Sequence, residues 1–154
     1  MLYVCYFLAA ALVVGLDQLV KWLVIRNISL FATVPVLPGV VHLTHIRNTG
    51  AAFSMLSGQR WPLVVITLAC MALVVWLLVK GGLPRLGNWC LVAVLGGAVG
   101  NLIDRLVNGY VVDMIEVEFI RFPVFNVADI FVVCGGILLC ISVLASGWGK
   151  NDAA

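Results

Sequence analysis

Two aspartates, Asp113 and Asp129, are the residues of this chain best suited to acid–base chemistry. The chain is 64% hydrophobic and only 10% charged, so a carboxylate near membrane depth is costly and indicates a functional role. Two carboxylates in close contact cannot both ionise cheaply, and they therefore share one proton. The ionised member can take a proton from water while the other donates one to a carbonyl oxygen, as peptide hydrolysis requires. The structural alternative is a separate salt bridge from each acid to Arg105 or Arg121.

A second acid–base pair, Asp17 and Lys21, lies in the first apolar stretch. The two residues are four apart on one helix face, in the order that favours an ion pair. A structural pair is the first interpretation, and a positioning role over a substrate is the second.

Amide side chains and an arginine form the remaining polar clusters. Asn48 and Gly50 stand in an Asn-x-Gly pattern, which alone is an ordinary turn signal. Asn101, Asp104 and Arg105 lie within about one helical turn of each other. Arg105 can neutralise Asp104 or bind an anionic group such as a lipid phosphate.

Other site chemistries find no support in the sequence. His42 and His45 are three apart on an expected strand and point to opposite faces, with no cysteine or acid nearby to complete a zinc site, so we expect neither metal nor cofactor. The five cysteines are widely separated within apolar stretches, where free cysteine behaves as a small hydrophobe. A net charge of +2 without a basic run excludes nucleic-acid binding.

The elements that must position these residues are membrane spans. Four stretches are long enough to cross a bilayer as helices, namely 2–25, 61–79, 86–107 and 127–148. The first lacks a basic leader and is too long for a cleavable signal peptide. We therefore expect an all-α membrane protein: a four-transmembrane-helix bundle forming one integral-membrane domain over residues 1–154.

Counting four spans brings all the polar clusters to one side of the membrane. The termini and the 80–85 loop share the opposite side. On the polar side, residues 27–60 are rich in β-branched residues with turn signals, which predicts a small sheet resting over the bundle. Residues 108–123 suggest a short amphipathic helix along the interface. The polar side carries more arginines than the opposite side has lysines and arginines together. Charge bias alone would therefore place the polar side in the cytoplasm.

Five motifs resemble those of the bacterial signal peptidase II family, over essentially the whole chain and in the family's order. They are Asp17-Gln18-Leu19-Val20-Lys21, Asn48-Thr49-Gly50-Ala51-Ala52-Phe53, Gly96-Gly97-Ala98-Val99-Gly100-Asn101-Leu102-Ile103-Asp104-Arg105, Val111-Val112-Asp113 and Phe125-Asn126-Val127-Ala128-Asp129.

The resemblance implies an aspartyl endopeptidase with an extracytoplasmic β-cradle, which cleaves prolipoproteins before a diacylglyceryl-modified Cys. Asp113 and Asp129 would be catalytic, and a set of support residues would line the site: Asp17, Lys21, Asn48, Gly50, Asn101, Asp104, Arg105 and Asn126. It further implies the bacterial cytoplasmic (inner) membrane, a site on the extracytoplasmic side, contact with membrane lipids, and inhibition by globomycin-type cyclic peptides. Nothing in the sequence requires a second subunit, so we expect a monomer.

Two other classes remain as alternatives. A small proton-coupled transporter would use intramembrane acids as relays, but it should show internal repeats and acids near the bilayer midplane. A non-enzymatic assembly subunit would use the polar residues only for helix contacts, and it would tolerate amide substitutions of the acids.

Overall fold

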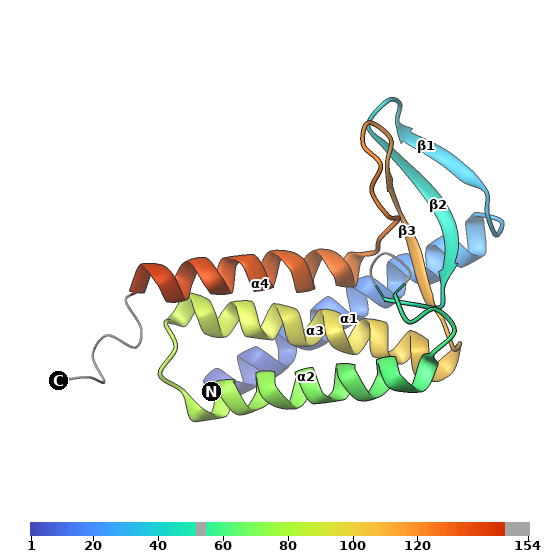
Figure 1. Cartoon of the computed structure of the whole chain (residues 1–154). Coiled ribbons are helices and arrows are strands. Elements are labelled where there is room, and N and C mark those ends of the chain that lie inside the picture. Colours follow the sequence, from blue (N-terminus) through green and yellow to red (C-terminus); the bar gives the residue numbers. More distant parts are fainter. Residues whose placement is uncertain (52–54, 147–154) are drawn as a thin grey trace.

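Four long helices form the body of the protein in the computed structural model, which describes residues 1–51 and 55–146 (Figure 1). They are α1 (Leu2–Asn27), α2 (Arg60–Lys80), α3 (Arg85–Val107) and α4 (Val127–Ser146). Each is long and apolar enough to cross a membrane, which confirms the four apolar helices predicted from the sequence. The last two residues of the predicted fourth span, 147–148, lie outside the described residues.

Helix α3 lies at the centre of the bundle. Half of its most apolar window is buried, against 11–22% for the other helices. Its glycines permit this, because a Cβ on Gly96 would lie 2.7 Å from the Val13 Cβ of α1. A Cβ on Gly97 would lie 2.5 Å from the Ala128 carbonyl oxygen of α4. The small residues therefore bring three helix backbones together at the depth where the polar residues begin.

A three-stranded antiparallel sheet stands at one end of the bundle, away from the N-terminus and the α2–α3 connection (Figure 1). Its strands are β1 (Thr33–Leu37), β2 (Val41–Asn48) and β3 (Val111–Val117), in the order β1-β2-β3. Pairing of β2 with β3 sets Ile46 opposite Asp113 and Asn48 opposite Val111. The sheet thus aligns residues from two distant segments over the end of α3.

Strand β3 corrects one expectation. The interfacial helix predicted within 108–123 is absent from that segment, all of which the structure describes, and β3 takes its place. The spacing of Val111, Met114 and Ile115 fits a helix, but β-branched residues also suit a strand, and β2 offers an unpaired edge. Val112 and Met114 are fully buried against Val24 and Ile28 at the end of α1. Packing of Val112 and Met114 against the end of α1, together with pairing to β2, therefore decided the conformation.

Candidate active site

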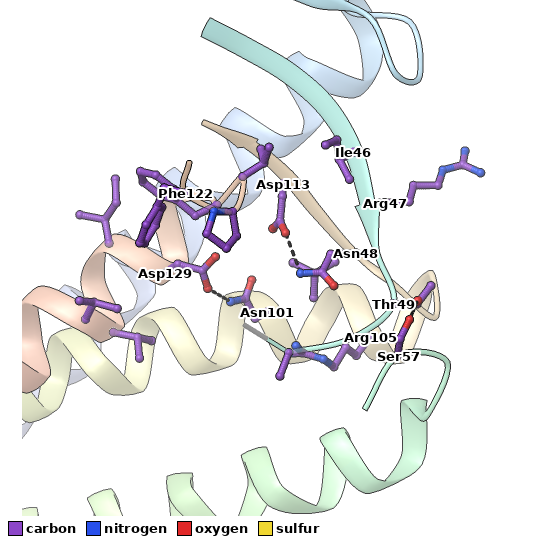
Figure 2. A pocket seen from close by; sticks show the side chains of 18 of the residues that line it. Ile46, Arg47, Asn48, Thr49, Ser57, Asn101, Arg105, Asp113, Phe122 and Asp129 are labelled. Carbon is purple, nitrogen blue, oxygen red and sulfur yellow. Dashed lines mark hydrogen bonds between the residues drawn. The ribbon is translucent and has the colours of Figure 1, made fainter. Parts of the chain in front are cut away.

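A pocket of about 810 Å³ opens where the sheet meets the ends of α3 and α4. Asp113 reaches it from β3 and Asp129 from the first turn of α4 (Figure 2). Asp113 is 2% exposed, whereas Asp129 is half-buried. The structure thus brings together, in one cavity, two acids that stand on different elements.

Each of the four carboxylate oxygens of Asp113 and Asp129 accepts one N–H bond. Asn48 Nδ2 and Asn126 Nδ2 donate to Asp113, at 2.8 and 2.7 Å. Asn101 Nδ2 donates to Asp129 at 2.8 Å, and the Asn126 backbone N–H donates to its other oxygen at 3.2 Å. Asn126 therefore bonds to both acids, the first through its side chain and the second through its backbone.

The donors to the two acids are neutral amides. In the described part of the chain, the ion pairs of the carboxylates involve Asp17, Asp104 and Glu118, and neither Asp113 nor Asp129 forms one with an arginine. The structural alternative of separate salt bridges is therefore not realised here. Without a bonded cation, a buried carboxyl keeps its proton more readily than one paired with arginine.

Burial raises the pKa of Asp113 to about 6 from its ordinary value of 3.8. The negative charge of Asp129 raises this pKa further, while the hydrogen bonds from Asn48 and Asn126 and the charge of Lys21 oppose the rise. The pKa of this carboxyl thus lies close to neutral pH, where a group can both hold and release a proton.

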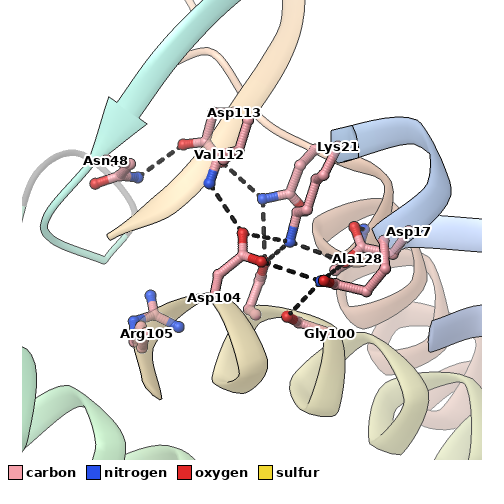
Figure 3. Close-up of polar contacts among 12 residues, drawn as sticks. Asp17, Lys21, Asn48, Gly100, Asp104, Arg105, Val112, Asp113 and Ala128 are labelled. Atoms are coloured by element: carbon pink, nitrogen blue, oxygen red, sulfur yellow. Dashed lines mark hydrogen bonds and ion pairs between the residues drawn. The ribbon is translucent and has the colours of Figure 1, made fainter. Parts of the chain in front are cut away.

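Asp17 and Asp104 hold the backbone beside the two acids (Figure 3). Asp17 Oδ1 accepts the backbone N–H of Ala128, the residue before Asp129, at 2.9 Å. Asp104 Oδ2 accepts the backbone N–H of Val112, the residue before Asp113, at 3.0 Å. Each buried carboxylate therefore fixes the chain one residue before an acid of the pocket.

Lys21 joins these two anchors. Its Nζ lies 2.8 Å from Asp17 and 3.1 Å from Asp104, so the predicted Asp17–Lys21 pair is part of a three-residue network (Figure 3). The same ammonium donates to Asn101 Oδ1 at 2.9 Å. Because that oxygen faces Lys21, the NH₂ group of Asn101 must face Asp129. Lys21 thus sets the orientation of an amide that bonds to the acid.

Gln18 and Gly100 belong to this network, although the sequence analysis did not select them as site residues. Gln18 Nε2 donates to the Gly100 carbonyl at 3.1 Å and to Asp104 Oδ1 at 3.0 Å. A Cβ on Gly100 would lie 2.5 Å from Asp17 Oδ2, so only glycine admits the Asp17 carboxylate here. Their positions inside the motifs were the available signal, since both flank residues that were selected.

Arg105 and Gly50 connect α3 to the segment after β2. Arg105 Nη2 donates to the Gly50 carbonyl at 3.1 Å, and the Gly50 N–H donates to Asn48 Oδ1 at 2.8 Å. The Asn-x-Gly turn is therefore formed, and it also orients the amide that bonds Asp113. Arg105 lines the pocket, but its contact is with this turn and not with Asp104. Ala52 and Phe53 of the same motif lie outside the described residues.

The two histidines lie apart from the pocket. His42 Nε2 contacts Glu118 at 2.9 Å, and His45 Nδ1 bonds to the Ile28 carbonyl at 2.8 Å. Both engage the sheet and its surroundings rather than each other.

Comparisons with known proteins identify the family of the chain. A family model described as signal peptidase (SPase) II matches residues 9–145. A lipoprotein signal peptidase of Enterococcus faecalis is 46% identical over 97% of this chain and 96% of its own length. One from Streptococcus pyogenes serotype M5 is 40% identical over 96% and 95%.

Two solved bacterial membrane enzymes share the fold. One, at 2.3 Å resolution, has a TM-score of 0.89 and 31% identity, covering 95% of this chain and 91% of its own. The other, at 1.9 Å, has a TM-score of 0.83 and 31% identity, covering 91% and 92%. With the family model matching most of its length, the chain belongs to the signal peptidase II family, the lipoprotein signal peptidases, and is a multi-pass membrane protease.

Proposed function

We propose that the protein is an aspartic endopeptidase that removes signal peptides from prolipoproteins, cleaving just before the diacylglyceryl-modified Cys. The observation that carries the proposal is the environment of Asp113 and Asp129: two carboxyls in one pocket, whose hydrogen-bond donors among the described residues are neutral amides. Such a pair can hold one proton between two acids, which is the state that aspartic catalysis needs.

In the proposed reaction the ionised acid removes a proton from a water molecule, whose oxygen attacks the scissile carbonyl carbon. The protonated acid donates its proton to the carbonyl oxygen, so that a neutral geminal diol forms. Collapse of the diol breaks the C–N bond. One hydroxyl proton returns to the acid that gave its own, and the proton taken from water passes to the leaving nitrogen of the lipidated Cys. The two acids regain their starting states.

The amides around the pair have separate roles in this proposal. Asn101 and Asn126 orient the carboxyls, since Asn101 donates to Asp129 and the Asn126 side chain donates both to Asp113 and to the Asn101 oxygen. Asn48 donates one amide N–H to Asp113, and no described residue accepts the second, which we assign to the substrate carbonyl. An added donor of this kind contributes a few kcal/mol in other enzymes. The backbone and amides around the two acids are held in place by the remaining support residues, namely Asp17, Lys21, Gly50, Asp104 and Arg105.

We place the protein in the bacterial cytoplasmic membrane as a monomer, with the sheet on the extracytoplasmic side. The number of arginines on that side would by itself favour the cytoplasm, but contacts within the fold explain why they are there. Arg26, Arg47 and Arg60 lie over the rings of Trp22, Tyr110 and Trp61, and Arg105 bonds to Gly50. Arginines engaged within the fold report less about orientation than free loop charges do. Globomycin-type cyclic peptides should occupy the same pocket.

The test uses purified protein with a diacylglyceryl-modified prolipoprotein, and cleavage is followed by the shift on a gel. Asp113→Asn and Asp129→Asn should each lower cleavage by at least about 10³-fold, because either change removes the shared proton or its acceptor. Glu118→Gln, an acid-to-amide change outside the pocket, should cleave normally. A metal chelator should have no effect. Full activity in either aspartate variant would refute the assignment of these acids.

A further inference from the structure

A second, apolar groove runs along the seam between α3 and α4. Trp89, Cys90 and Ala93 form its α3 side, and Ile130, Cys134 and Leu138 lie on its α4 side. Gly135 brings the helices together there, since a Cβ on it would lie 3.0 Å from the Cys90 carbonyl oxygen. The volume of the groove is about 330 Å³, and its surface is almost wholly hydrocarbon.

The dimensions of the groove decide what fits it. From Ile130 to Leu138 the groove extends about 12 Å at the helical rise of 1.5 Å per residue. A helix with side chains is about 10–12 Å across. A single hydrocarbon chain is much narrower than such a helix and suits a groove of this length and volume.

The groove adjoins the pocket of the two acids. Ile130 and Cys134 line both cavities, and Ile130 follows Asp129 directly. A chain attached close to the scissile bond could thus pass from the acids into the seam without leaving the protein surface. This lining shared with the pocket of the two acids distinguishes the groove from the other apolar surfaces of the described helices.

We propose that the groove between α3 and α4 binds one acyl chain of the diacylglyceryl group on the substrate Cys. The proposal rests on the function proposed above and adds a subsite to it. The chain leaves lipid rather than water, so its transfer brings little hydrophobic gain. Its contribution is to orient the modified Cys, and thereby the scissile bond, against the two acids. The second acyl chain stays in the bilayer.

The first test fills the groove. Ala93→Phe places a ring in it, and Ala72→Phe, the matched control, places one on an exposed face of α2. Each variant is assayed with a dipalmitoyl and a dibutanoyl form of the same prolipoprotein peptide. Ala93→Phe should lower kcat/KM about tenfold for the dipalmitoyl form alone, because only a long chain reaches past Ile130. Ala72→Phe should alter neither value. Equal effects of Ala93→Phe on both substrates would overturn the proposal.

A second measurement does not depend on the activity of the filled variant. The inactive Asp129→Asn variant binds the prolipoprotein peptide without cleaving it, and the palmitoyl chain of this peptide carries a diazirine at its end. After illumination, the labelled residues are mapped by mass spectrometry. Labels should fall on residues 86–93 and 130–138. Equal labelling by a phosphatidylglycerol with the same diazirine would mean that ordinary lipid occupies the groove, and labels elsewhere would exclude the acyl chain. If the wild type cleaves neither peptide, the proposed function itself fails, and this labelling test still reports on the groove.

Discussion

Replacing Asp113 by Asn should stabilise the folded protein while abolishing its activity. The Asp113 carboxyl is 2% exposed and its pKa is raised to about 6. A raised pKa means that the fold disfavours the ionised form, so the wild type loses stability as the pH rises from about 4 to about 6. Above that window the penalty is complete. An uncharged side chain escapes it.

The size of the effect follows from two opposing contributions. A rise of about two pKa units corresponds to about 3 kcal/mol at neutral pH, at 1.36 kcal/mol per unit. The substitution also replaces one acceptor oxygen by an NH₂ group. Asn48 and Asn126 both donate to this carboxylate, so one donor then faces another donor. That mismatch costs about 1 kcal/mol. The expected net gain is about 2 kcal/mol at neutral pH.

Unfolding of both proteins in detergent, followed at pH 7.5 and pH 4, measures the difference. At pH 7.5 the variant should be the more stable. Near pH 4 the wild-type carboxyl is protonated in the fold and its penalty disappears, so the variant should be equal or slightly weaker. Glu118→Gln serves as the control, since this acid is exposed. A gain of the same size at both pH values, or a loss at pH 7.5, would refute the account of Asp113 as a costly buried charge.

Two further changes test the frame around the acids. Gly97→Ala places a Cβ 2.5 Å from the Ala128 carbonyl oxygen, so α4 must shift beside Asp129. We expect stability to fall by about 1–3 kcal/mol and kcat to fall by up to about 10²-fold. Gly136→Ala is the control and should change neither quantity, because the space around its Cβ is open. Unchanged melting and turnover in Gly97→Ala would contradict the close approach of the two helices. Lys21→Met leaves the Asp17 and Asp104 carboxylates buried without their cation and should cost about 3–5 kcal/mol. Adding Asp17→Asn to this variant should restore part of the lost stability, as measured by thermal unfolding. A Lys21→Met protein as stable as the wild type would show that the ion-pair network does not stabilise the fold.

Much of the architecture could be predicted from composition and order along the chain. Apolar stretches of sufficient length specify membrane helices because the bilayer requires them to satisfy their own backbone. Counting four such stretches brought Asp17, Asn101 and Asp129 to one end, and the structure places them there. The β-branched residues and turn signals of residues 27–60 also predicted a small sheet, and the strands within 33–48 belong to it. These features depend on local sequence and on the lipid environment.

The tertiary structure alone decided the rest. The segment 111–117 carries a pattern that suits either a helix or a strand, and it became β3 because β2 offered backbone partners and α1 offered a surface for Val112 and Met114. Whether Asp113 and Asp129 form a shared pair or separate salt bridges to Arg105 or Arg121 was equally open in the sequence. Residue types state which bonds are possible, but the fold determines which donors reach a buried oxygen. That selection, made by packing across α1, α3, α4 and β3, determines which hydrogen bonds the two acids accept.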